Sequence, residues 1–182
     1  MSFETPFSAI NVKQGFTKEG GPVLQAIGHA VHERRDFIQV AYRLNGGWES
    51  WAQVELAVYL AEGFQHGATV VVERETAVID QTTGKKKWVD FDISTEKAGS
   101  DFLVEMKCQS FHNAKNFTSD VLKDLAKVGK YNVGPHGTWK TGCVVGICVV
   151  EGDATNLEDL MAHGFTAAKV KDCHIVIFYK QF

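Results

Sequence analysis

The sequence predicts an α/β protein with a mixed central β-sheet flanked by helices, and three observations support this class. Short runs rich in β-branched and aromatic residues predict strands over 68–79, 88–94 and 101–109. Apolar residues at helical spacing predict helices before and after these strands, over about 48–67 and 118–131. A continuous apolar run over 141–150 is typical of a strand that helices cover on both faces.

The length and composition predict one globular domain. The chain has 182 residues, of which 45% are hydrophobic and 11% aromatic, enough to bury a sizeable core. We expect a helical cover over 1–47, a central unit over about 48–150, and a C-terminal helix and strand over 151–182. The succession of strand, helix and strand at the C-terminal end predicts a βαβ crossover.

The N-terminal cover is predicted to be mainly helical. Pro22 suits a first helical turn, and apolar residues follow it at helical spacing: Val23, Leu24, Ile27 and Val31. Residues 37–44 fit a strand or a continued helix equally well, and the glycines after Asn45 end the segment.

The predicted helix over 48–67 is apolar around much of its circumference, so we expect it to lie buried between layers. Glu55 sits in the middle of that apolar surface. Burying a carboxylate without a partner is costly. Glu55 therefore needs either a structural ion pair or a role in holding a metal.

Alternation along the two strands before the second long helix places charged residues together. Leu103, Glu105, Lys107 and Gln109 share one face of the strand over 101–109. Asp90 and Asp92 share the face of the preceding strand that is opposite to Val89, Phe91 and Ile93. If these strands pair as a hairpin, one face of the sheet carries two acids and a lysine close together.

This combination suits metal-assisted phosphodiester hydrolysis. Mg²⁺ is usually held by one or two carboxylates together with water and phosphate oxygens. A lysine beside the metal neutralises charge on a phosphate or helps to activate water. A Glu and a Lys two residues apart also occur on ordinary solvated strand faces, so the order of the surrounding elements has to support the assignment.

With these residues in this order, the sequence resembles the PD-(D/E)XK, or restriction-endonuclease-like, nuclease superfamily over about 48–150. The resemblance implies an α-β-β-β-α-β core with an acid on the first helix, an acid on the second strand and Glu-x-Lys on the third. The matching residues are Glu55, Asp90, Glu105 and Lys107, and Gln109 extends the match. No proline precedes Asp90, and Asp92 is an alternative to it as metal ligand.

The resemblance also implies an activity and a set of roles. It implies a nuclease that depends on Mg²⁺ or Mn²⁺ and cleaves DNA in preference to RNA. Asp90, Glu105 and the backbone carbonyl of Met106 would bind the metal, and Lys107 would align the attacking water. Glu55 would orient a further ligand, and Gln109 would orient Lys107 or phosphate. Such a nuclease is compatible with a homodimer.

Nucleic-acid contacts are expected to be local, because the net charge of −3 argues against binding through bulk electrostatics. Lys85, Lys86 and Lys87 enter the strand over 88–94 and suit either phosphate contacts or a solvated sheet edge. The resemblance also makes His112 and Lys127 candidates for phosphate contacts.

Other classes of protein have less support in the sequence. Cys108, Cys143, Cys148 and Cys173 lack the C-x-x-C spacing of a zinc site and are expected to be buried, reduced thiols. Neither a run of 18 apolar residues nor a signal-like N-terminus is present, which favours a cytoplasmic protein. The alternative function is a catalytically inactive protein of the same fold that acts as a binding, immunity or regulatory module.

Overall fold

The computed structural model describes residues 20–45, 47–63, 70–95, 102–131, 141–150, 158–170 and 173–182. The helices in this part of the chain are α1 (Gly20–Glu33), α2 (Arg35–Ala41), α3 (Glu49–Gly63), α4 (Phe117–Val128) and α5 (Glu158–Ala162). The strands are β1 (Val70–Ile79), β2 (Lys86–Thr95), β3 (Phe102–Cys108), β4 (Thr141–Val149), β5 (Thr166–Lys169) and β6 (Ile175–Gln181). They form one sheet in the order β1-β2-β3-β4-β6-β5, which confirms the predicted α/β class.

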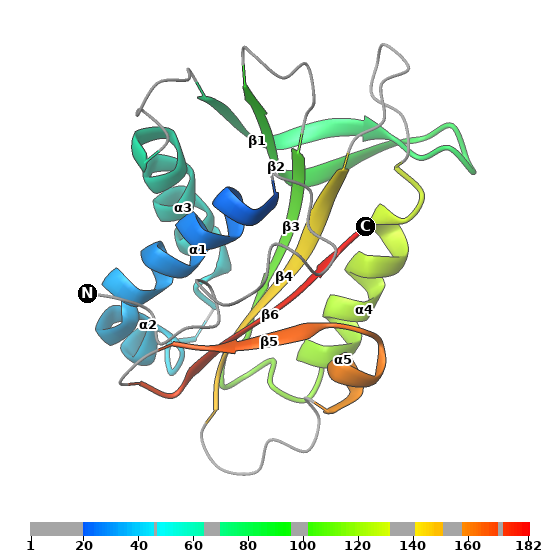
Figure 1. Ribbon diagram of the computed structural model, residues 1–182. Coiled ribbons are helices and arrows are strands. Elements are labelled where there is room, and N and C mark those ends of the chain that lie inside the picture. The colour runs from blue at the N-terminus through cyan, green and yellow to red at the C-terminus, as the bar shows by residue number, and fades with distance from the viewer. Residues whose placement is uncertain are drawn as a thin grey trace.

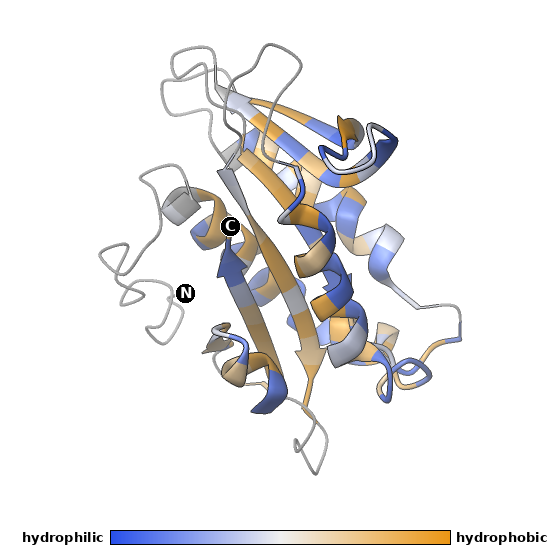
Figure 2. Cartoon of the chain, turned by 90° about the vertical axis from the view of Figure 1, so that its right-hand side faces the viewer, coloured by the Kyte–Doolittle hydropathy of each residue, from blue (hydrophilic) through white to orange (hydrophobic). Residues whose placement is uncertain are grey.

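The sheet is mixed and lies between two layers of helices (Figure 1). Strands β3 and β4 are parallel, whereas the other neighbouring pairs are antiparallel. One core cluster joins α1, α2 and α3 to the sheet, and a second joins α4 and α5 to its opposite face. Figure 2 shows hydrophobic residues concentrated along the central strands between these layers.

Close packing of α4 on β4 requires a glycine. A Cβ atom added at Gly146 would lie 3.0 Å from Cζ of Phe117 and 3.3 Å from Cγ2 of Val121. Both of these side chains are buried in the core cluster on the α4 side. The absence of a side chain at Gly146 therefore sets how closely α4 approaches the sheet.

The structure settles one expectation and corrects another. Of residues 37–44, which fitted a strand or a helix, residues 37–41 belong to α2. The C-terminal crossover ends on β5 and not on the last strand: β4 and β5 run parallel with β6 between them, and β6 pairs with both in the antiparallel direction. The expectation did not include β5, an edge strand that follows α5 and reverses direction into β6. Among the described residues, no helix is both long and apolar enough to cross a membrane.

The β1–β2 hairpin changes the face that it buries halfway along its length. Phe91 and Ile93 pack in the core on the α1–α3 side, whereas Val89 packs with Val78 on the α4 side. The expectation that Val89, Phe91 and Ile93 share one face is therefore wrong. Glu75, aligned with Asp90 by the β1–β2 register, has a positive φ of 51°, so the backbone is distorted at this level. Beyond the distortion, the hairpin bends away from β3 toward the end of α4 (Figure 1).

Candidate functional site

Asp90 lies where β2 separates from β3. The last paired residues of these two strands are Phe91 and Val104, and Asp90 is the next residue of β2 beyond that pair. The Asp90 carboxylate then accepts a hydrogen bond of 2.7 Å from the backbone N–H of Met106. Asp90 is thereby fixed against the residue between Glu105 and Lys107, as the predicted site requires.

Glu105 is buried and forms an ion pair with α4. Its side chain is 3% exposed, and its Oε1 lies 2.5 Å from Nζ of Lys127. Lys127 was predicted as a phosphate contact on the outer face of its helix. It lies instead beside β3, because the face of α4 that carries Lys127 turns toward that strand.

Lys107 joins α3 and α4 to the same site. Its ammonium group donates a hydrogen bond of 2.8 Å to Oε1 of Glu49 and lies 3.7 Å from Oδ2 of Asp124. The other Glu49 oxygen accepts a hydrogen bond of 2.9 Å from the backbone N–H of Cys108. Glu49 thus holds both the side chain of Lys107 and the backbone next to it.

Glu49 was not predicted, although it has a local explanation. It is the first residue of α3, where the helix dipole favours a negative charge. The indole N–H of the preceding Trp48 donates a hydrogen bond of 2.8 Å to the backbone carbonyl of Gln109. This contact ties the start of α3 to the end of β3. The available sequence signal was an acid two residues after the Gly-Gly pair, at the first position of the helix.

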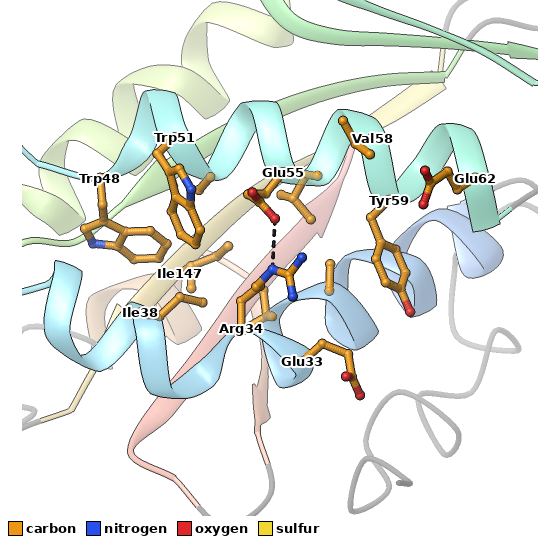
Figure 3. Close-up of a pocket in the computed structure, with 14 residues that line it drawn as sticks. Glu33, Arg34, Ile38, Trp48, Trp51, Glu55, Val58, Tyr59, Glu62 and Ile147 are labelled. Carbon is orange, nitrogen blue, oxygen red and sulfur yellow. Dashed lines mark hydrogen bonds and ion pairs between the residues drawn. The ribbon is translucent and has the colours of Figure 1, made fainter.

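Glu55 is not brought to this cluster. It lies six residues after Glu49, or about 240° further around the helix, and faces α1 and α2. Its Oε2 is 2.8 Å from Nε of Arg34. Figure 3 shows this pair between Trp51 and Tyr59, in a cavity of about 250 Å³ between the helices. Of the two alternatives for Glu55, the structure therefore contains the ion pair.

The cluster has an excess of negative charge. It holds four carboxylates, from Glu49, Asp90, Glu105 and Asp124, against the two ammonium groups of Lys107 and Lys127. Burial and the nearby Asp90 carboxylate raise the pKa of Glu105 to about 8, although Lys127 opposes this shift. The site therefore disfavours full ionisation of its carboxylates.

The remaining groups of the cluster respond to the same charges. Burial raises the pKa of Asp90, against the opposing hydrogen bond from Met106. Burial also raises the pKa of Asp124, with the two lysines acting against it. For Lys107, burial lowers the pKa, but the contact with Glu49 and the charge of Asp124 outweigh burial and raise it. Lys107 is therefore a stable cation.

The donor chemistry fits a hard divalent cation in part. Carboxylate oxygens are the ligands that Mg²⁺ and Mn²⁺ prefer, and full ionisation of the four carboxylates would leave two excess negative charges, which would balance one such ion. Within the described residues, however, no three His, Cys, Asp or Glu side chains converge as a metal-binding group. Two of the carboxylates are instead paired with lysines: Lys107 contacts Glu49, and Lys127 contacts Glu105. A cation bound at Glu105 would therefore compete with Lys127.

The other predicted site residues lie around this cluster. Asp92 is buried, but it pairs in register with Leu103, two positions before Glu105, so Asp90 is the acid bonded to the Glu-x-Lys segment. Gln109 follows β3, and its backbone joins β4 through the Ile147 carbonyl as well as holding Trp48.

The predicted basic contacts fall into two regions. Lys85, Lys86 and Lys87 are exposed where the β1–β2 hairpin turns. His112 is exposed on the loop after β3, where its ring contacts the edge of Phe111. Both regions adjoin strands that contribute to the cluster.

The cysteines are buried free thiols, as expected. Burial raises the pKa of Cys108, Cys143, Cys148 and Cys173, so none of these thiols is activated as a nucleophile.

Comparisons with protein-family models, with curated proteins and with solved structures found no match. Any function assigned to this chain consequently depends on the geometry and chemistry of the cluster itself.

Proposed function

We propose that the protein is a nuclease that depends on Mg²⁺ or Mn²⁺ and hydrolyses the phosphodiester bonds of DNA or RNA. One observation carries the proposal: Asp90, Glu105 and Lys107, from neighbouring strands, lie in one partly buried cluster. The chain order α3-β1-β2-β3-α4-β4 supports it, because the PD-(D/E)XK resemblance implies this succession of elements.

Each residue of the cluster has a role in the proposal. Asp90, Glu105 and the Met106 carbonyl would hold the cation, with Glu49 taking the place of the helix acid. When bound, the cation would neutralise phosphate charge and make a water more acidic. Lys107, held as a cation by Glu49 and Asp124, would donate a hydrogen bond to the phosphate or orient the attacking water.

A second candidate is a catalytically inactive binding module of the same fold. The observation that favours it is the pairing of lysines with the carboxylates that would otherwise bind metal. In that case the cluster would be a buried ion-pair network that joins α3, β3 and α4. Metal binding separates the candidates, because the binding module requires none.

The test is cleavage of plasmid DNA, single-stranded DNA and total RNA with Mg²⁺, Mn²⁺ or EDTA. We expect metal-dependent cleavage by the parent, and its loss in Lys107→Ala and Glu105→Gln. Lys123→Ala is the matched control, because the exposed Lys123 lies on α4 but pairs with Asp120 outside the cluster. Circular dichroism must show that every variant is folded.

Two outcomes decide between the candidates. Cleavage that both cluster variants abolish and the control retains supports the nuclease. No cleavage of any polymer, together with no heat of Mn²⁺ binding in calorimetry, would favour the binding module. The cytoplasmic location and the homodimer are further proposals, which cell fractionation and light scattering would test.

A further inference from the structure

The outer half of the β1–β2 hairpin presents a large aromatic side chain to solvent. Its inner face is accounted for by packing, since Val78 and Val89 are buried against the end of α4. The neighbouring residues Trp88 and Ile79 point to the other face of the hairpin, and their side chains are 57% and 48% exposed. Trp88 stands opposite the small Ala77, which leaves its ring uncovered on that side. Packing within the chain therefore does not explain Trp88.

Positive charge surrounds this tryptophan. Between Thr76 and Trp88 the hairpin carries three lysines, Lys85, Lys86 and Lys87, and one acid, Asp80. The ammonium group of Lys86 lies 4.7 Å from the centre of the Trp88 ring. The surface thus combines an exposed ring with local positive charge on a chain whose net charge is −3.

The hairpin turn holds this surface in place. Oδ1 of Asp80 accepts hydrogen bonds from the backbone N–H groups of Thr82 and Thr83, at 2.9 and 3.0 Å. The backbone N–H of Gln81 also donates to the carbonyl of Lys130 at the end of α4. Asp80, the single acid in this half of the hairpin, therefore stabilises the turn by accepting backbone hydrogen bonds. The backbone that carries the lysines is thereby held in place.

The surface adjoins the candidate site. Trp88 precedes Asp90 by two residues on β2, which corresponds to about 7 Å along the strand. Because the hairpin changes its buried face at this level, Trp88 lies next to the cluster along β2 but not on the same face as the cluster.

From these observations we propose that the Trp88 surface, meaning Trp88 and Lys86 on one face of the hairpin together with the exposed Lys87 between them in sequence, binds an unpaired segment of nucleic acid. A base would stack on the Trp88 ring while Lys86 and Lys87 contact phosphates. Bases in a duplex are already stacked and cannot reach a side chain on a strand face, so the ligand is single-stranded. The inference rests on the proposed function, because it names the substrate class of that site.

Binding without cleavage provides the test. Fluorescence anisotropy in EDTA would follow labelled oligonucleotides of about 12 nucleotides, within the site sizes of single-strand binding proteins. Deoxyribose and ribose single strands and a matched duplex would distinguish DNA, RNA and paired substrates. The variants are Trp88→Ala, Trp88→Phe and the double variant Lys86→Ala/Lys87→Ala. Phe37→Ala is the control, since Phe37 is an aromatic residue of similar exposure on α2.

The proposal predicts a graded result. The parent binds a single strand more tightly than the duplex, Trp88→Ala weakens binding roughly 5- to 150-fold, and Trp88→Phe weakens it less. The double lysine variant reduces the slope of log K against log salt by about 1.4. Tryptophan fluorescence is quenched on binding to the parent, and Trp88→Phe removes most of this quenching, whereas Phe37→Ala leaves binding unchanged.

The outcomes also separate this inference from the proposed function. Three results would overturn the proposal that the Trp88 surface binds single strands, even if metal-dependent cleavage is found. They are absence of oligonucleotide binding, equal affinity of the parent and Trp88→Ala, and preference for the duplex. Single-strand binding that depends on Trp88 would support it, even if no polymer is cut with Mg²⁺ or Mn²⁺, and in that case only the nuclease proposal fails.

Discussion

Glu49 and Glu55 lie on the same helix but make different contacts. Glu49 bonds to Lys107 and to the backbone of β3, whereas Glu55 pairs with Arg34 at the surface of the helical layer. The PD-(D/E)XK resemblance assigned the helix acid to Glu55, which has apolar neighbours in sequence. Its partner is an arginine of the N-terminal cover, which no motif around Glu55 reveals.

Substitution of these two acids separates their roles. We expect Glu49→Gln to lower the cleavage rate by roughly 10²- to 10³-fold, because it removes the charge that orients Lys107. Glu55→Gln should change cleavage little and cost at most about 1 kcal/mol of stability, as expected for an exposed ion pair. Initial rates on the best substrate and urea unfolding of both variants would check this. Equal loss of cleavage in the two variants would contradict the placement of the site.

Glu105 should make stability depend on pH. Because its pKa is about 8 in the folded protein and about 4.5 ordinarily, the unfolded chain releases this proton first as pH rises. The free energy of unfolding should therefore fall between about pH 5 and 8, by up to about 1.4 kcal/mol per pH unit from this group.

The matched variant is Glu105→Gln, which stays neutral and should flatten that part of the pH profile. Urea unfolding in EDTA at several pH values would measure both proteins. The raised pKa values of Asp90 and Asp124 act in the same direction and remain in the variant, so the difference between the profiles isolates Glu105. Parallel profiles would argue against a protonated Glu105 at neutral pH.

At the scale of elements, the site depends on how closely α4 approaches the sheet. Asp124 and Lys127 reach the Glu-x-Lys strand only because α4 packs over Gly146 through Phe117 and Val121. The helix itself was predictable from its apolar spacing. Which charged side chains face inward depends on this contact.

Enlarging Gly146 should therefore affect both stability and site. Gly146→Ala should destabilise the protein by about 1 kcal/mol and Gly146→Val by about 1–3 kcal/mol, because the added Cβ would lie only 3.0 Å from Phe117 and valine adds further volume at the same place. Gly129→Ala is the control, since a Cβ there meets only a carbonyl at 3.6 Å. Unfolding in urea would measure the series. A Gly146→Val protein as stable as the parent would show that α4 is not tightly held.

At the scale of the whole molecule, a bound cation should link the layers, because Glu49 lies on α3 while Asp90 and Glu105 lie on strands. The proposed metal site then predicts stabilisation by mass action. Mn²⁺ at 100 times its Kd should add about 2.7 kcal/mol to the free energy of unfolding.

Thermal unfolding with and without Mn²⁺ would measure this effect. We expect the cation to raise the Tm of the parent, EDTA to reverse the rise, and Asp90→Asn to abolish it. An equal rise in the parent and in Asp90→Asn would indicate binding elsewhere on the chain and not at the cluster.

The sequence by itself determined the elements and the local part of the site. The strands and helices follow from spacing and composition, and the alternation of β3 places Glu105 and Lys107 on one face wherever that strand lies. The tertiary structure alone decided that Asp90 and not Asp92 bonds to the Glu-x-Lys segment, that Glu49 and not Glu55 lies in the cluster, and that Lys127 faces inward. Each depends on contacts between distant segments: the separation of β2 from β3, the rotation of α3, and the packing of α4. Sequence periodicity describes the faces of an element but not which neighbour each face meets.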